Sequence, residues 1–319
     1  MVLPAYVKYE IIHETISHDD NCLSIAKLCR LAEVSRSGYY SWVGNAGKRA
    51  EREEKDRKEF DKILAAYKYR GYAKGALMIN MRLLHMGILM NVKKIRRLMK
   101  KYGLRCPVRK ANPYRRMAKA LKTDKVFPNI VDRKFTSQGA RKVLLTDITY
   151  LSYQGGMCYL STILDAYTRE ILAYKVSSSL AVSFVLDTID TLIAQHECTL
   201  EDTTIIHSDQ GCHYTSKAFI SKLRDAEFVQ SMSRKGNCWD NAPQESFFGH
   251  MKDEIRAELT GCASFDDVSK LIDDWIDYYN TDRYQWELCK LSPHEYYIYI
   301  TTGDYPTGMY RGSAPNPEV

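Results

Sequence analysis

The pattern of hydrophobic and polar positions changes near residue 141 of this 319-residue chain. Upstream, apolar side chains recur every three or four residues, as at Phe60, Ile63, Leu64 and Tyr67, which is the period of an amphipathic helix. Downstream, short apolar runs typical of strands alternate with helical stretches. The sequence therefore predicts an all-α N-terminal part followed by an α/β part.

The first helical elements form a small hairpin. The pattern predicts one helix over 24–31 and a second over 36–42, joined by a tight turn. Two short helices joined in this way are typical of a helix-turn-helix, whose second helix would present Arg36, Ser37 and Tyr40 to a DNA groove. The alternative is a helical hairpin that does not touch DNA.

Three further helical stretches follow, over 51–70, over 72–86 and after Asn91, which is a favourable N-cap residue. The last one places apolar residues on one face and basic residues on the other, which favours a second DNA-binding unit. Its apolar face comprises Val92, Ile95, Leu98 and Met99, and its basic face comprises Lys93, Lys94, Arg96, Arg97, Lys100 and Lys101.

The α/β part has a recognisable order of elements. Three strands are followed by helix, strand, helix, strand and helix, which indicates a mixed five-stranded sheet flanked by helices, the RNase H-like arrangement. The expected strands cover 143–150, 157–164, 170–176, 203–207 and 228–232, and the expected helices cover 181–196 and 216–226 and open again near Pro243.

Charge is strongly segregated along the chain. Residues 62–142 hold 23 Lys and Arg against two acids, a formal balance of +21, whereas the remainder holds 23 against 37, or −14. A block of one sign this large indicates a polyanionic partner, and DNA is the natural one. The alternative is a basic face that only aids solubility. Within this block, 105–125 is a proline-interrupted basic connector that could follow phosphates through Arg109, Lys110, Arg115 and Arg116.

Cysteine usage and hydropathy narrow the class of protein. Nine cysteines without a C-x-x-C pair, and no signal-peptide pattern, favour reduced thiols in the cytoplasm. No apolar run approaches the roughly 18 residues of a membrane span. The group His13, His18, Cys22 and Cys29 has poor spacing for zinc, and a core thiol at Cys29 is the preferred interpretation.

Three carboxylates stand out in the α/β part. Asp147 lies in the apolar run that starts at Val143, Asp209 ends the run that starts at Thr204, and Glu245 lies one turn into the helix opening near Pro243. A carboxylate on a buried strand is costly unless it is paired or bound to metal. Mg²⁺ prefers a few carboxylates, water and phosphate oxygens, so this set predicts metal-assisted phosphoryl transfer on nucleic acid.

The segments around these acids carry a family resemblance. They are Thr146 to Tyr150, His207 to Ser216, and Gly236 to Ala242 with Glu245, and 35 residues separate Asp209 from Glu245. They resemble the integrase core of bacterial insertion-sequence transposases, most closely the second-frame (OrfB) product of the IS-three family. The resemblance extends to the N-terminal helices and to 279–293, and so covers nearly the whole chain.

The resemblance implies a domain organisation and an activity. Residues 1–50 would be the helix-turn-helix module, 51–112 the second helical DNA-binding module, 113–137 a basic linker, 138–300 the RNase H-like catalytic core and 301–319 a tail. Asp147, Asp209 and Glu245 would be the catalytic Asp/Asp/Glu (DDE) set, which binds two Mg²⁺ ions, or Mn²⁺ in their place. The implied activity is binding of terminal inverted repeats followed by DNA cleavage and strand transfer.

Partners follow from the same resemblance. They are double-stranded DNA at the element ends and at the target, and further copies of the chain in a paired-end complex at the nucleoid. An upstream-frame protein is commonly fused in this family, although nothing here resembles its leucine zipper. Leu144 stands where the family often has Trp, and 70–78 matches the family pattern poorly.

Four further polar or aromatic residues have two interpretations each. Lys252 follows Glu245 by seven residues at nearly the same helical azimuth, so it could grip a phosphate, or else be a solvated lysine. Asp165 is interpreted as a turn cap rather than a fourth catalytic acid. His207 either orients Asp209 or is a core histidine, and Trp239 is favoured as core packing over base stacking.

Two rival functions remain. A structure-selective RNase H-class nuclease would cleave DNA without joining it. A non-catalytic regulator would bind DNA without needing the acids, and the presence of all three disfavours it.

Overall fold

The computed structural model describes residues 3–106, 127–132, 135, 138–201, 203–234 and 241–306. It divides into two compact units, residues 1–64 and 65–319. The connector candidates Arg109, Lys110, Arg115 and Arg116 lie outside the described residues, as do Gly236 and Trp239.

The first unit is a small helical bundle that contains the expected hairpin. Its helices are α1 (Ala5–Ile16), α2 (Ile25–Leu31), α3 (Arg36–Gly44) and the first part of α4 (Ala46–Lys68). Ser24 and Ser35 cap α2 and α3, because their hydroxyls accept backbone N–H groups of the first turn. Cys29 lies in the core with Ile12 and Tyr39 and is therefore a core thiol. Helix α1 was not predicted.

The second unit begins with a helical pair, α5 (Ala76–His85) and α6 (Val92–Lys101). Asn91 caps α6 as expected, because its Oδ1 accepts the N–H of Lys93 at 2.8 Å. Residues 72–75, which were expected to be helical, precede the helix. Lys74 is buried there and donates to the carbonyls of Tyr67 and Tyr72, at 3.3 and 2.8 Å, so this segment closes the end of α4 instead.

The remainder of the second unit is built on one mixed five-stranded sheet. Its order is β3-β2-β1-β4-β5, with β1, β2 and β3 antiparallel to one another and β4 and β5 parallel to β1. This confirms the RNase H-like fold that the sequence predicts. The strands are β1 (Val143–Tyr153), β2 (Gly156–Asp165), β3 (Ile171–Ser177), β4 (Ile205–Ser208) and β5 (Val229–Met232).

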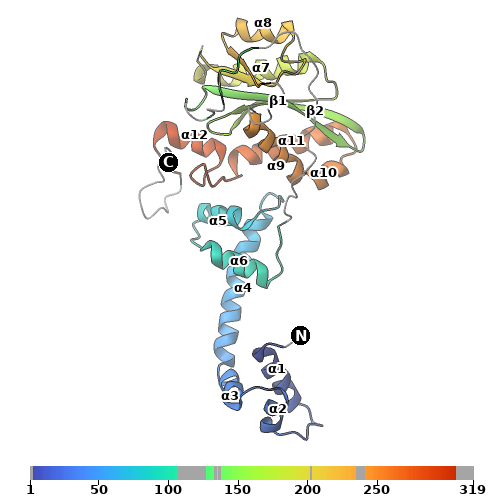
Figure 1. Ribbon diagram of the computed structural model, residues 1–319, viewed down its shortest axis with the longest axis vertical. Coiled ribbons are helices and arrows are strands. Elements are labelled where there is room, and N and C mark those ends of the chain that lie inside the picture. The colour runs from blue at the N-terminus through green and yellow to red at the C-terminus, as the bar shows by residue number, and fades with distance from the viewer. Residues whose placement is uncertain are drawn as a thin grey trace. The chain divides into compact units, whose positions relative to one another are not determined.

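Helices cover both faces of the sheet, as Figure 1 shows, with α7 and α8 on one face and α9 to α12 on the other. This arrangement buries the apolar residues of both faces in two separate cores. The helices are α7 (Val182–His196), α8 (Lys217–Asp225), α9 (Ala242–Glu254), α10 (Arg256–Gly261), α11 (Phe265–Thr281) and α12 (Pro293–Thr302), and a short 3₁₀ turn, η1 (Glu197–Thr199), follows α7.

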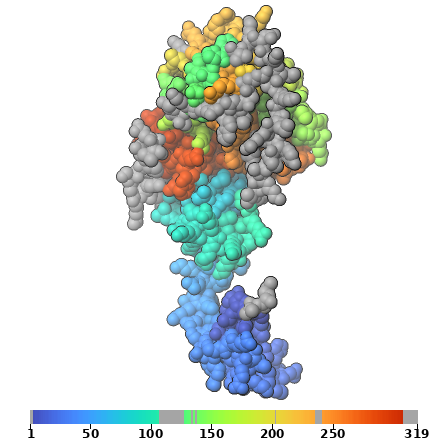
Figure 2. Space-filling view, in the orientation of Figure 1, coloured from blue at the N-terminus to red at the C-terminus, as the bar shows by residue number. Residues whose placement is uncertain are grey.

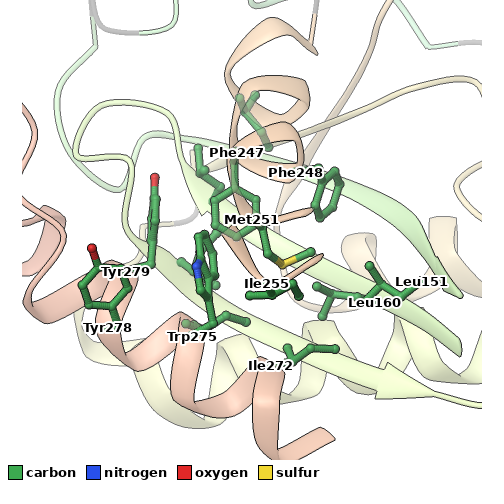
Figure 3. Packing of buried hydrophobic residues seen from close by; sticks show 14 of the residues in the cluster. Leu151, Leu160, Phe247, Phe248, Met251, Ile255, Ile272, Trp275, Tyr278 and Tyr279 are labelled. Carbon is green, nitrogen blue, oxygen red and sulfur yellow. The ribbon is translucent and has the colours of Figure 1, made fainter. Parts of the chain in front are cut away.

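Helix α9 is anchored by an aromatic core (Figure 3). Phe247 and Met251 on α9 pack beside Trp275 on α11, whose ring is completely buried. The indole Nε1 of Trp275 donates to Glu254, which also pairs with the buried Arg283 at 2.9 Å. These contacts seat the helix that carries Glu245 against the sheet.

Asp165 belongs to a buried charge cluster where β1 begins. Its Oδ2 accepts from the backbone and guanidinium of Arg141 and from the Thr168 hydroxyl, and its Oδ1 accepts the N–H of Tyr167 at 3.0 Å. Arg141 also pairs with Glu170 at 2.6 Å. Asp165 is therefore a structural carboxylate, which agrees with its interpretation as a turn cap.

The helices and the cysteines bear on the membrane and redox expectations from the sequence. None of the helices in the described ranges is both long and apolar enough to span a bilayer. In the same ranges the cysteines are free thiols, and Cys29, Cys158 and Cys262 are buried.

Candidate active site

The sheet brings Asp147 and Asp209 together. Strands β1 and β4 run parallel, with Leu145 opposite His207. Continuing this register by two residues puts Asp147 level with Asp209, just past the end of β4. Because neighbouring strands lie about 4.8 Å apart and side chains at one level share a face, the two carboxylates are neighbours. The third acid, Glu245, lies in the first turn of α9.

Burial and like charge together change the protonation of Asp147. Burial is the larger cause, and the charges of Asp209 and Glu245 add to it, raising the pKa of Asp147 to about 8. The backbone N–H of Ile148, which donates to Oδ1 at 2.8 Å, and the charge of Lys252 both oppose the rise. The charges of both other acids thus act on the protonation of Asp147.

Asp209 is held by the turn that follows it. Its Oδ1 accepts the N–H of Gly211 at 2.8 Å, and a Cβ at Gly211 would sit only 2.8 Å from that oxygen. Partial burial of the carboxyl raises the pKa of Asp209, while Gly211 and the nearby His213 oppose the rise. A glycine at 211 therefore lets the backbone approach the carboxylate closely.

The three acids form a pair with a third member nearby. Among the described residues, no three His, Cys, Asp or Glu side chains converge on one point that could hold an ion. Asp147 and Asp209 are the adjacent pair, and Glu245 is within electrostatic range of Asp147. Glu245 is only partly buried.

Lys252 acts on the same site from α9. Its positive charge is one of the causes that oppose the rise in the pKa of Asp147. Its spacing of seven residues from Glu245 puts the two positions at nearly the same azimuth of α9.

His207 is fully buried between two strands. Its Nδ1 is 2.9 Å from the hydroxyl of Ser231, and its Nε2 is 3.1 Å from that of Ser233. Of the two interpretations of this residue, these contacts support a hydrogen-bonded core histidine that ties β4 to β5 next to Asp209.

Several residues near the acids were not identified as site residues from the sequence. The phenol of Tyr214 is buried, and its pKa is raised by burial first and then by Asp147 and Asp209. Asn241 and Gln244 contact Asp147 and the neighbouring strand from the start of α9. The sequence signal that could have identified Asn241 and Gln244 is their position next to Glu245. Spacing alone does not reveal that their side chains face inward.

The DNA-binding candidates on α3 and α6 lie on helical faces that are largely exposed. Arg36, Ser37 and Tyr40 are exposed at the start of α3, the second helix of the hairpin. On α6 the apolar face is buried at Ile95 and Leu98. In Figure 2 the blue-green surface of α5 and α6 faces the viewer and is largely uncovered. The basic side chains of α6 are exposed at Lys93, Arg96, Arg97, Lys100 and Lys101 and half-buried at Lys94.

Family models match three stretches of the chain. Residues 138–238 match one model described as "Integrase core domain", and residues 227–293 match a second with the same description. Residues 53–112 match a model described as "HTH-like domain". The matched core contains the sheet, the three acids and α9.

Curated relatives align over most of their length. A protein of Haemophilus influenzae, "Uncharacterized transposase-like protein", is 36% identical over 216 residues, 66% of this chain and 94% of the relative. The "Putative transposase for insertion sequence element IS986/IS6110" of Mycobacterium tuberculosis is 31% identical over 263 residues, 79% of this chain and 91% of the relative. The chain belongs to the bacterial insertion-sequence transposases. Its type is IS3 OrfB: "Transposase InsF for insertion sequence IS3A" of Escherichia coli is 28% identical over 282 residues, 86% of this chain and 93% of the relative.

Solved structures similar to this transposase include two retroviral integrase cores. The HTLV-2 integrase catalytic core domain in complex with magnesium gives a TM-score of 0.37 at 14% identity and covers 46% of this chain and 90% of its own. The BIV integrase catalytic core gives 0.40 at 16% identity and covers 51% and 96%.

Membership of the family fixes the class of activity. The transposase is a DDE-type polynucleotidyl transferase of DNA transposition and integration, with an integrase core and an HTH-like domain. The integrase core family is metal-dependent.

Proposed function

We propose that Asp147, Asp209 and Glu245 are the catalytic acids of this transposase and hold two Mg²⁺ ions, for which Mn²⁺ substitutes. The supporting observation is that Asp147 on β1 and Asp209, directly after the adjacent parallel strand β4, come level when the strand register is continued, with both Asp209 and Glu245 close enough to raise the pKa of Asp147. We further propose that the site cleaves one strand at each terminal inverted repeat and then transfers the freed 3′-hydroxyl to target DNA.

The donor set fits a divalent cation of the Mg²⁺ type. Asp147 on β1 and Asp209 directly after β4 offer hard oxygen ligands, and neighbouring like charges are stabilised by a cation between them. Glu245 on α9 supplies the third carboxylate. When bound, the ions lower the pKa of the attacking water or hydroxyl and offset charge on the leaving oxygen.

Neighbouring groups orient the catalytic acids, and Lys252 contacts the substrate. Asp147 is fixed by the Ile148 amide and Asp209 by the Gly211 amide, so both carboxylates present their remaining lone pairs in a set direction. Lys252, on the same side of α9, binds a phosphate next to the scissile bond. No nucleophilic side chain is needed, because water or the 3′-hydroxyl attacks the phosphorus directly and the 3′-oxygen of the cleaved strand leaves.

DNA recognition is assigned to the helical parts. The hairpin of residues 1–50 and the second module of 51–112 bind the terminal repeats, the basic linker of 113–137 follows phosphates, 138–300 is the catalytic core and 301–319 is a tail. The same proposal includes a homo-oligomer that bridges two DNA ends at the nucleoid, and an upstream-frame product as fusion partner.

A strand-transfer assay tests the proposed function. The full chain is incubated with Mg²⁺, an oligonucleotide duplex carrying the element end and a plasmid target. We expect end cleavage and joined products. Cleavage without joining would favour the nuclease, and end binding with neither product would favour the regulator.

Metal binding should depend on pH through Asp147. Its pKa of about 8 means that a proton must leave before an ion binds. We expect Ca²⁺ affinity to rise by up to about tenfold per pH unit below this pKa and to level off above it. Calorimetry in two buffers of different ionisation enthalpy should show a proton released near neutral pH. An affinity that does not change with pH would contradict this assignment.

The basic face of α6 should contribute to DNA affinity through phosphates. Replacing Lys93, Arg96 and Lys100 with alanine should weaken binding and reduce the slope of log K against log salt by about 0.9 per lost phosphate contact. The slope is measured by fluorescence anisotropy with labelled end duplex. The charge-matched control replaces the exposed Lys175, Lys217 and Arg224 of the core. An equal loss in both variants would show that only total charge matters.

A further inference from the structure

The start of α9 lacks the cap that its sequence favours. Asparagine is a preferred N-cap residue because its side-chain oxygen usually accepts an N–H of the first turn. Asn241 occupies the N-cap position of α9 but makes no such hydrogen bond. Its Nδ2 instead donates to Oδ2 of Asp147 at 3.3 Å. The side chain therefore contacts the acid on β1 in place of its own helix.

A second amide in the same turn contacts the neighbouring strand. Gln244 is fully buried, and its Nε2 donates to the hydroxyl of Thr162 on β2. Thr162 lies directly opposite Asp147 in the β1–β2 register. Asn241 and Gln244 thus contact both members of one cross-strand pair.

Both amides keep a buried oxygen without a hydrogen-bond partner. Asn241 is 5% exposed and Gln244 is 0% exposed, and within the described part of the chain neither Oδ1 of the first nor Oε1 of the second has a partner. An unsatisfied buried polar atom costs free energy, and an apolar side chain would avoid this cost. Two such atoms at the start of the helix that carries Glu245 indicate that the amides serve the site rather than stability.

We propose that Asn241 and Gln244 are positioning residues that lock α9 to the β1–β2 pair and so aim Glu245 at Asp147. This inference rests on the proposed function. Apolar contacts such as those of Phe247 and Met251 hold one face of α9 against the sheet (Figure 3), and Glu254 anchors its far end through Trp275. The first turn, which carries Glu245, is held by the two amides. Two hydrogen bonds from positions three apart fix both rotation and axial shift, and Glu245 follows Gln244 directly.

The neutral charge of the amide suits this task. Asp147 receives one donor on each oxygen, Ile148 on Oδ1 and Asn241 on Oδ2. One lone pair remains on each oxygen for a ligand. A charged donor such as lysine at 241 would instead compete with a cation for the carboxylate.

Two variants test the inference in the full chain. Asn241→Ser keeps a good N-cap residue but cannot reach Asp147, and Gln244→Met keeps the side-chain length without the donor. We expect each to weaken Ca²⁺ binding by about 10- to 100-fold in calorimetry, and to raise the Mg²⁺ concentration for half-maximal end cleavage similarly. Thermal unfolding and end-DNA binding should stay near those of the unchanged chain. Ser246→Ala, exposed in the same turn, is the matched control.

The outcomes separate this inference from the proposed function. If both variants bind Ca²⁺ within twofold of the unchanged chain while Glu245→Gln is inactive, the acids are catalytic and the positioning role is wrong. A loss of Ca²⁺ affinity that only tracks a lowered unfolding temperature in both variants would also overturn it. If Glu245→Gln keeps full affinity and cleavage, the proposed function fails and this inference fails with it.

Discussion

Asp147→Asn should abolish Mg²⁺-dependent end cleavage and strand transfer, with a loss of about 1,000-fold or more. The substitution keeps the shape of the side chain and an oxygen for the Ile148 amide. It removes the negative charge of the acid whose pKa is raised by both Asp209 and Glu245. Metal-based stabilisation of a phosphoryl-transfer transition state supplies several kcal/mol, and each 1.36 kcal/mol changes the rate about tenfold. The measurement is single-turnover cleavage of labelled end duplex.

Folding and DNA binding should survive the same substitution. Because burial and like charge raise the pKa of Asp147, the charged form is unfavourable in the folded chain, and a neutral Asn should leave the unfolding temperature unchanged or slightly higher. Asp187→Asn, an exposed acid on α7, is the matched control and should cleave normally. Cleavage by Asp147→Asn at more than about a tenth of the normal rate would falsify its catalytic role.

The elements that carry the acids were predictable because each has a strong local signal. The strand that carries Asp147 opens with the apolar residues Val143 to Leu145, as a strand buried on both faces requires, and Pro243 marks the first turn of a helix. The register that makes Asp147 and Asp209 neighbours follows from pairing β1 with β4 in parallel. The order of elements alone was enough to predict this sheet.

What could not be predicted depends on contacts between distant segments. Asn241 is a normal helix-capping residue in the sequence, and its turn towards Asp147 depends on where β1 lies. Helix α1 has a weak pattern because only Ile12 on it is buried. The segment 72–75 was assigned to a helix because nothing in its sequence shows Lys74 closing the end of α4.

Arg141 is the clearest case of a role that only the fold reveals. In the sequence it belongs to the basic block, where a lysine or arginine is expected to face DNA. In the structure it is 5% exposed, pairs with Asp165 and Glu170, and lies 4.0 Å from the ring centre of Tyr297 on α12. Formal charge along a sequence therefore overstates the charge that is available to a partner.

Arg141→Met should destabilise the folded chain by about 3–5 kcal/mol. The variant keeps an aliphatic side chain but leaves the fully buried Asp165 without its cation and Glu170 with His294 alone. The loss should appear as a lower midpoint in urea unfolding followed by tryptophan fluorescence. Arg169→Met is the matched control, because its partner Glu287 is exposed, and such a surface pair contributes at most about 1 kcal/mol.

The pH dependence of this loss identifies its cause. Burial raises the pKa of Asp165 although Arg141 opposes the rise, so removing Arg141 should raise it further. A carboxyl whose folded-state pKa is raised costs no folding stability when the pH is below its unfolded pKa of about 3.9. Its cost to stability grows as the pH rises above that value. The deficit of Arg141→Met should therefore be largest near neutral pH and shrink as pH falls towards 4. A deficit equal at all pH values would assign the effect to lost packing against Tyr297 instead of to unpaired buried charge.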